Sequence, residues 1–245
     1  MYRILCLNGG GIRGALQVGA LKHVDLNFPD GIYGISIGAI LGSLIAFQFS
    51  IQEIEAFTLA LRLDEMLDLR FCIPLDTAQQ IHIHLSKLFS TKGLCFDDLR
   101  IGDAHMPLYV IASDMTRLKI VIFGEHVALW DALRSSFSLP LLFAPHRLDG
   151  REFVDGAVLC RNIVKLVPKC DRHLVLALLT NTTLEGFQKM LHGVSAMEIL
   201  KMRKKYPRNV CVLQNSTGML DADADMKSLI ETGAQCMKEW NTLCK

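Results

Sequence analysis

The sequence predicts an α/β fold with a mainly parallel sheet covered by helices on both faces. Short apolar runs alternate along the chain with longer segments of helical character, as in strand–helix–strand units. The runs contain few polar residues, as expected for parallel strands that are buried on both sides. The 245 residues, 51% of them hydrophobic, can bury a large core, so we expect a single domain over residues 1–245.

The elements follow one another in a regular order. We expect strands at residues 4–7, 32–35, 108–112, 119–123, 174–179 and 210–213. We expect helices at residues 15–24, 37–49, 51–61, 77–89, 130–136, 184–205 and 224–240. The segment 64–74 is rich in Leu, Met and Phe, and we interpret it as a packed connection rather than a mobile apolar lip.

Charge and cysteine content narrow the function classes. The chain has 26 basic and 25 acidic residues, a net charge of +1, which gives no reason to expect a nucleic-acid partner. Its eight cysteines form no C-x-x-C pair, and no histidines cluster at metal-ligand spacing. We therefore expect reduced thiols and no metal site.

The N-terminus and one uncharged segment bear on the cellular location. A strand and a glycine cluster occupy the first ten or so residues, leaving no room for the apolar core of a secretory signal, so we expect a cytoplasmic or peripheral membrane protein. Residues 31–52 carry no charge and are long enough to span a bilayer. Glycines and serines interrupt their apolar character, so a strand, a turn and a buried helix explain them better.

The most informative motif is G-x-S-x-G, with Ser36 between Gly34 and Gly38. It lies between a short apolar strand and an uncharged helix, as in a nucleophile elbow. Glycines beside the serine let two chain segments cross closely. The N–H groups of Ser36 and Ile37 would then lie at a helix N-terminus, where they favour a developing oxyanion. The alternative is a glycine-rich turn before a buried helix.

A second glycine motif, from Gly9 to Gly14, lies between the first expected strand and helix. The consecutive glycines Gly9, Gly10 and Gly11 would present N–H groups to an anion, either a phosphate or an oxyanion. A dinucleotide-binding unit requires an acidic residue at the end of the next strand, about 20 positions on. Asp30 instead precedes that strand, so we favour an oxyanion cradle beside Ser36.

A serine nucleophile needs a base, and the most suitable candidate is Asp155. It stands at the end of a short apolar strand, followed by Gly156 and Ala157, where its carboxylate could reach a serine hydroxyl directly. The histidines carry no local signature of a base. The alternative is a purely structural role, in which Asp155 and Gly156 form an ordinary turn.

In this order, the three motifs resemble those of the patatin-like phospholipase family. Further similarity lies in residues 113–116 before 119–123, in residues 134–140 with 143–145, and in Asn162. The resemblance implies a patatin-like three-layer sandwich with a Ser-Asp dyad, in which Ser36 is the nucleophile and Asp155 the base. It assigns the oxyanion hole to Gly9, Gly10 and Gly11. It also implies that Gly14, Gly34, Gly38, Gly156 and Ala157 belong to the motifs.

The resemblance further implies a lipid acyl hydrolase that cleaves glycerophospholipids or related acyl lipids, at a membrane surface and without a metal or organic cofactor. Arg13 would steady the glycine loop, meet a phosphate, or form a structural salt bridge. The chain departs from the family pattern at Asn8, at Ile163 and at residues 178–180. These departures affect loop shape and substrate fit rather than the reaction class.

Three other interpretations remain open. An α/β-hydrolase would use His173 or His192 in a Ser-His-Asp triad. A catalytically silent protein would bind lipid without cleaving it, and a nucleotide-binding module would use the glycine motif for phosphates.

Overall fold

The computed structural model describes residues 2–61, 77–140, 142–168, 172–180, 197–217 and 224–244. Within these residues, five parallel strands form the centre of the sheet in the order β3-β2-β1-β7-β8. They are β1 (Ile4–Leu7), β2 (Gly31–Ile35), β3 (Leu108–Asp114), β7 (His173–Thr180) and β8 (Val210–Asn215). The α/β class with a mainly parallel sheet is therefore confirmed.

Three antiparallel strands complete the described sheet beside β3: β4 (Lys119–Ile122), β5 (His146–Leu148) and β6 (Arg151–Asp155). Both β4 and β6 pair with residues 112–114 of β3, so they lie on opposite edges of it. Ile111 of β3 pairs with β4 on one side and with β2 on the other. β2 therefore lies on the edge of β3 that β6 also occupies. The carboxyl end of β2 therefore meets the carboxyl end of β6.

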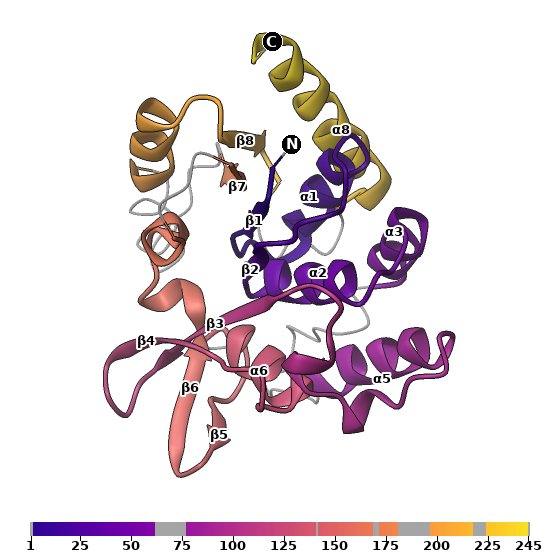
Figure 1. Cartoon of the computed structure of the whole chain (residues 1–245), viewed down its shortest axis with the longest axis vertical. Helices are drawn as coiled ribbons and strands as arrows, with labels where there is room; N and C mark the ends of the chain where they lie inside the picture. Colours follow the sequence, from indigo (N-terminus) through magenta and orange to yellow (C-terminus); the bar gives the residue numbers. More distant parts are fainter. Residues whose placement is uncertain are drawn as a thin grey trace.

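One face of the sheet carries the larger core (Figure 1). Helices α1 (Gly14–Leu21), α2 (Ile37–Ala46) and α8 (Met226–Leu243) pack there, with α3 (Ile51–Ala60) beside them. Helices α5 (Thr77–Ser90) and α6 (Leu129–Ser136) continue this layer toward β3. Every residue of α1 is buried, because the sheet lies on one side of it and α8 on the other.

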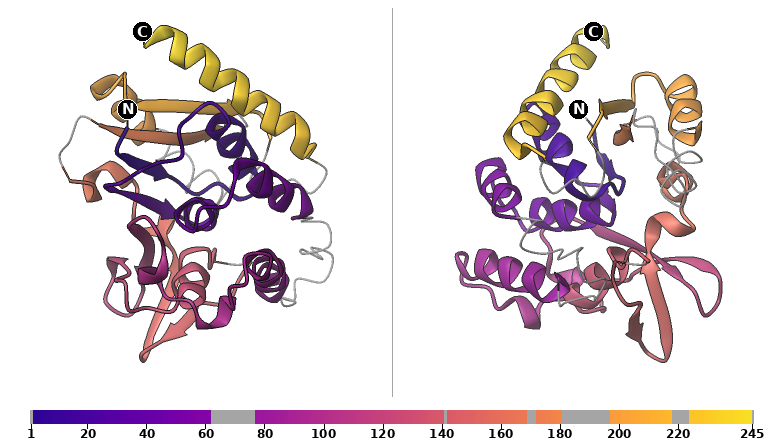
Figure 2. Two further views of the ribbon diagram at one scale, coloured as in Figure 1. Left: turned by 45° about the vertical axis from the view of Figure 1, so that its right-hand side comes forward. Right: turned by 180° about the vertical axis from the view of Figure 1, so that it is seen from behind.

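The opposite face is covered by shorter elements, which Figure 2 shows from two further directions. These are the single turns η4 (Gly156–Val158) and η5 (Ile163–Leu166) and a helical segment at residues 197–205. They bury a second, smaller core that includes Cys6, Ile35, Ile163 and Met202. Helices thus lie on both faces, as in the three-layer arrangement that the sequence predicts.

All six expected strands and six of the seven expected helices form within three residues of their predicted bounds. Helix α2 ends earlier than expected, at Ala46, and the expected helix at 184–205 is described only from residue 197. Strand β5 was not predicted, and only the apolar end of β6 before Asp155 was, because charged residues such as Arg151 and Glu152 interrupt the apolar character of these strands. The segment 64–74 lies outside the described residues.

The uncharged segment 31–52 forms β2, a sharp turn and the buried helix α2, as expected, and its last two residues begin α3. Among the described helices, none combines the length and the apolar character needed to cross a bilayer.

Candidate active site

Ser36 lies on the sharp turn between β2 and α2. Its backbone adopts φ 57° and ψ −127°, a conformation that costs a non-glycine residue energy and is typical of functional sites. The flanking glycines permit the close crossing, because a Cβ on Gly38 would lie 2.3 Å from the carbonyl oxygen of Leu7. A Cβ on Gly34 would lie 2.5 Å from Cα of Ala39. The local geometry is therefore that of the elbow expected from the motif.

The glycine loop lies directly against this elbow. A Cβ on Gly9 would come within 2.9 Å of Cβ of Ser36, and a Cβ on Gly14 within 2.4 Å of Cγ1 of Ile37. Gly9 and Gly10 line the same pocket as Ser36. Gly11, with φ 57°, begins the turn η1 (Gly11–Arg13). It is not among the residues that line this pocket.

The N–H of Ser36 has a partner that the sequence analysis did not anticipate. It donates to Oγ of Ser136 at 2.9 Å, and that hydroxyl donates to the carbonyl oxygen of Ile111 at 2.7 Å. The expectation that the Ser36 N–H helps to form an oxyanion hole is therefore wrong for this conformation. Ser136 comes from α6, and it ties the elbow to β3. Its segment was noted only as part of the family resemblance, which assigned the serine no role.

Asp155 is the last residue of β6 and pairs with Ala112 of β3. The preceding residue of β3, Ile111, pairs with Ile35, the last residue of β2. This register brings the carboxylate to Ser36 although 118 residues separate the two in the sequence. The Asp155 backbone is held by Ser138, whose carbonyl accepts the Asp155 N–H at 2.9 Å. The hydroxyl of Ser113 donates to the Asp155 carbonyl at 2.9 Å.

Asp155 is only 2% exposed. Burial raises its pKa to about 6, and hydrogen bonds from the Ala157 N–H and the Ser36 side chain partly oppose this rise. The N–H of Ala157 donates to Oδ1 at 2.9 Å, so Ala157 orients the carboxylate. Gly156 permits the close turn, because a Cβ there would lie 2.5 Å from the carbonyl oxygen of Ile111. A carboxylate with a raised pKa that shares a pocket with a serine hydroxyl is chemically suited to accept its proton.

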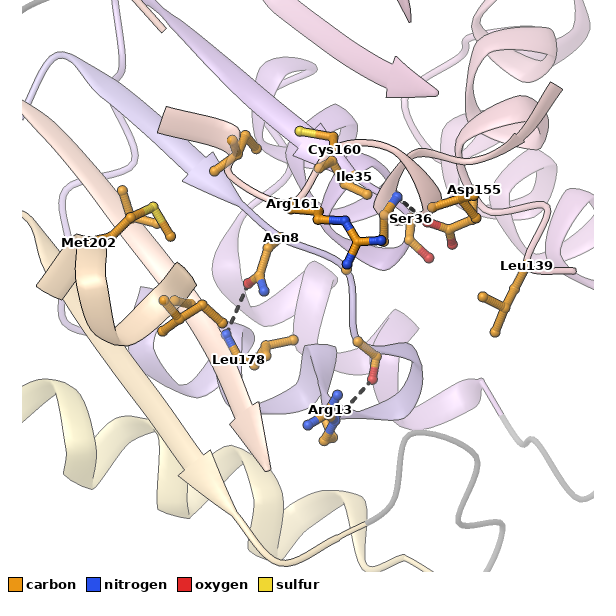
Figure 3. A pocket seen from close by; sticks show the side chains of 18 residues that line it. Asn8, Arg13, Ile35, Ser36, Leu139, Asp155, Cys160, Arg161, Leu178 and Met202 are labelled. Carbon is orange, nitrogen blue, oxygen red and sulfur yellow. Dashed lines mark hydrogen bonds between the residues drawn. The ribbon is translucent and has the colours of Figure 1, made fainter. Parts of the chain in front are cut away.

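Arg13 is buried beneath the glycine loop (Figure 3). Its Nε donates to the carbonyl oxygen of Gly10 at 3.3 Å. Burial lowers the pKa of the guanidinium to about 10. Of the roles considered from the sequence, steadying the glycine loop agrees best with this geometry.

Two departures from the family pattern meet on the other side of the loop. Oδ1 of Asn8 accepts the N–H of Leu178 at 2.9 Å, as Figure 3 shows, and so links the end of β1 to β7. Nε2 of Gln17 donates to the carbonyl oxygens of Asn8 and Leu176, both at 3.0 Å. A neutral amide at position 8 thus serves as an acceptor in a hydrogen-bond network that joins β1, α1 and β7.

His173, which was considered for a triad, lies away from the serine. His173 begins β7 and pairs with Ile4 at the start of β1. It therefore lies at the amino ends of the parallel strands, whereas Ser36 lies at their carboxyl ends. His192 lies outside the described residues. No histidine of the described ranges lines the pocket around Ser36.

The remaining expectations concern nucleotides, metals and thiols. Asp30 forms a surface ion pair with Arg3 before β2, rather than ending a strand as a ribose-binding acid would. In the part of the chain that is described, no three His, Cys, Asp or Glu side chains are grouped to hold a metal ion. The six cysteines of that part are free thiols.

Comparison with known proteins agrees with the motifs. The family model described as Patatin-like phospholipase matches residues 5–106 and 110–165, which is more than half of the chain. The chain is 32% identical over 170 residues to patatin-like phospholipase domain-containing protein 7 of Rattus norvegicus, covering 62% of this chain and 12% of that protein. It is 28% identical over 192 residues to the protein YqhO of Bacillus subtilis, covering 65% and 64% of the two chains.

Among solved structures, VipD from Legionella pneumophila has a similar fold, with a TM-score of 0.63 over 99% of this chain and 67% of that one. The identity is 15%, so this similarity concerns the fold alone. The chain spans only about an eighth of the length of the rat relative.

Proposed function

The chain belongs to the patatin-like phospholipase family, a family of lipid hydrolases, and we propose that it cleaves carboxylic esters of acyl lipids through an acyl-serine intermediate. The proposed machinery lies in one acyl hydrolase domain over residues 1–245. One observation carries the proposal: Ser36, on a strained elbow, lines the same pocket as the buried carboxylate of Asp155, and its side chain helps to lower the pKa of that carboxylate. This arrangement supports a Ser-Asp dyad, because the base contacts the nucleophile without an intervening histidine.

In the acylation step, Asp155 accepts the proton of the Ser36 hydroxyl while Oγ attacks the ester carbonyl. The carbonyl oxygen becomes an oxyanion, which N–H groups of the loop formed by Gly9, Gly10 and Gly11 would stabilise. Within the described residues, the N–H groups of Gly10 and Gly11 donate to no backbone or side-chain acceptor. Collapse of the tetrahedral intermediate expels the alcohol, which takes the proton from Asp155 and leaves an acyl-serine.

In the deacylation step, the same carboxylate accepts a proton from water, and the hydroxide attacks the acyl-serine. Asp155 then returns this proton to Oγ of Ser36 as the fatty acid leaves. Every proton transfer begins and ends on the dyad, the alcohol or water, so the cycle that we propose needs no metal or organic cofactor.

We propose glycerophospholipids or related acyl lipids as substrates, presented at a membrane surface. Apolar side chains line much of the pocket around Ser36, which suits an acyl chain; they are Ile35, Leu139, Leu178, Ile199 and Met202. The hairpin between β3 and β4 exposes Met115, Leu118, Ile120 and Ile122 to solvent. This hairpin extends from the carboxyl end of β3. Ser36 follows the carboxyl end of the neighbouring parallel strand β2, so both lie at the same end of the sheet. An exposed apolar patch at this end suits contact with lipid.

The test combines active-site labelling with a lipid panel. A fluorophosphonate probe should label the wild-type chain and not Ser36→Ala. Fatty acid release should be measured from phospholipid, lysophospholipid and triglyceride, each supplied as vesicles or emulsions and as short-chain monomers. We expect Ser36→Ala to lower release by roughly 10⁴-fold or more. Labelling or hydrolysis that persists in Ser36→Ala would contradict the assignment of the nucleophile, and unlabelled wild-type protein would favour a silent lipid binder.

The histidine alternative has its own control. His173→Ala and His192→Ala should retain most of the hydrolysis, because the proposed base is a carboxylate. Loss of activity in either variant with normal folding would favour a Ser-His-Asp triad.

A further inference from the structure

Arg161 brings a positive charge into the pocket from a side that the proposed dyad does not use. It lies in the connection between η4 and η5, directly after Cys160. Figure 3 shows its guanidinium extending from this connection into the pocket, toward Ser36. The backbone on either side is anchored, since the Cys160 N–H donates to the Gly156 carbonyl at 2.9 Å and Oδ1 of Asn162 accepts the Val164 N–H at 3.1 Å. The base of the side chain is thus held in place while its charged end reaches the pocket.

The Arg161 charge is available to a ligand. The residue is exposed, and within the described ranges no carboxylate forms an ion pair with it. The acid of the pocket, Asp155, is engaged by Ala157 and Ser36. The other cation of the pocket, Arg13, is buried and donates to the Gly10 carbonyl. The pocket therefore carries an accessible guanidinium beside the proposed nucleophile.

This placement selects the kind of ligand. A guanidinium presents a planar fork of donors that matches the oxygens of a phosphate, and two such charge-assisted hydrogen bonds give both affinity and orientation. In a glycerophospholipid, the phosphate is joined to the ester-bearing carbons by the short glycerol backbone. A neutral acylglycerol has a hydroxyl or a further ester there and leaves the guanidinium without an anionic partner.

We propose that Arg161 binds the phosphate of the lipid substrate and so makes the enzyme select phosphate-bearing acylglycerols over neutral ones. This inference rests on the proposed function, because it places the phosphate relative to an ester held at Ser36. Arg161 is then a specificity-determining residue, and its removal changes which ester is preferred more than it changes the chemistry of the dyad.

The kinetic test compares two soluble substrates with identical acyl groups, dihexanoyl phosphatidate and dihexanoylglycerol. We expect Arg161→Gln to lower the ratio of their kcat/KM values by about 10- to 100-fold, the loss typical of a hydrogen-bonded ion pair. Arg161→Lys should recover part of the ratio, because it keeps the charge without the fork. Arg208→Gln is the matched control, because Arg208 is an exposed arginine away from the pocket. The next residue, Asn209, accepts a hydrogen bond from the N–H of Val175 near the start of β7. An unchanged ratio in Arg161→Gln overturns the proposal.

A binding measurement separates this inference from the catalytic one. In the Ser36→Ala background, calorimetry should give a dissociation constant for dihexanoyl phosphatidate that rises at least about 10-fold when Arg161→Gln is added. That result supports the phosphate site even where hydrolysis by the wild type is absent. Equal affinities in the two variants overturn it. Inorganic phosphate that binds as tightly as the lipid also overturns it, because the site would then recognise free phosphate.

Discussion

The two faces of the sheet are built differently, and the difference separates stability from chemistry. On the larger core, α1 and α8 cross so closely that a Cβ on Gly233 would lie 2.0 Å from the carbonyl oxygen of Leu16. On the smaller core, single turns and the helical segment 197–205 cover the strands, and the pocket lies among them. The first face is closed by long helices in tight contact, whereas the second leaves room for a ligand beside Ser36.

The residues of the site also differ in what they contribute to stability. Asp155 is buried with a pKa raised to about 6, which means that its ionised form is less stable in the folded protein than in water. Ser36 occupies an unfavourable backbone conformation. These features lower stability where the proposed chemistry occurs, and the larger core offsets them. Substitutions on the two faces should therefore have opposite consequences for activity and for stability.

Among the substitutions that compare the two faces, the largest effect is expected for Asp155→Asn. It should lower kcat/KM by about 10²- to 10⁴-fold, because an amide cannot accept the proton of Ser36. In the wild type, kcat/KM should rise with pH through about 6 and then level off, as Asp155 becomes ionised. Initial rates measured between pH 4.5 and 8.5 check both expectations, and a pH profile that is flat across this range would contradict the role of Asp155.

The same variant should be more stable than the wild type at neutral pH. Because the pKa of Asp155 is raised in the folded state, its stabilising contribution is fully present below about pH 4 and is lost as the pH rises through about 6. The loss amounts to about 3 kcal/mol, and a neutral amide avoids it. Chemical denaturation at pH 4 and pH 7 should show the gain only at pH 7. Asp149→Asn, at an exposed turn, is the control and should show none.

The next effect, on the opposite face, is expected for Gly233→Ala. The added methyl group meets the backbone of Leu16, which can move only if α1 and α8 separate. We expect a loss of about 3 kcal/mol in unfolding free energy and a melting temperature lower by roughly 6–12 °C. The activity of the folded fraction should remain near that of the wild type.

Gly124→Ala provides the matched control, because a Cβ there meets no atom within 4 Å and the position is exposed. Its unfolding free energy should change by less than about 0.5 kcal/mol. If Gly233→Ala abolished activity without lowering stability, the separation between the two faces would be wrong.

The sequence revealed those parts of the site whose signals are local. The elbow at Ser36 follows from five adjacent residues, and the strands β1 and β2 follow from uninterrupted apolar runs. The meeting of Asp155 with Ser36 depends instead on β2 and β6 sharing one edge of β3. A register of this kind is set by long-range pairing, and the charged residues at the start of β6 concealed the length of the strand.

The contacts of Ser136 and Arg161 escaped sequence reasoning for a related reason. Serine on a helix ordinarily bonds its own preceding turn, as Ser135 does to the carbonyl of Asp131. Nothing in the residues beside Ser136 indicates that its hydroxyl leaves the helix to reach Ser36, 100 positions earlier. Arg161 likewise follows a turn, and only the folded chain shows that it points into the pocket.

The smallest effect is expected for Ser136→Ala, which tests whether the elbow needs support from outside its own motif. The substitution leaves the Ser36 N–H and the Ile111 carbonyl without the hydroxyl that joins them, at 2.9 Å and 2.7 Å respectively. Unpaired buried groups cost about 1–3 kcal/mol, so the elbow should relax and displace Oγ of Ser36. We expect kcat to fall about 10-fold with little change in KM, because the substrate pocket is retained while the nucleophile is misplaced.

Ser135→Ala separates this positioning role from a general effect on α6. Both serines are buried on the same helix, but among the described residues Ser135 bonds only within it, so its removal should leave kcat unchanged. Ser136→Thr keeps the hydroxyl and should recover much of the kcat lost in the alanine variant. Steady-state kinetics beside denaturation curves make the comparison. Equal losses of kcat in the two alanine variants would show a general effect of α6. Lower stability of Ser136→Ala with normal kcat would show that the elbow positions its nucleophile without Ser136.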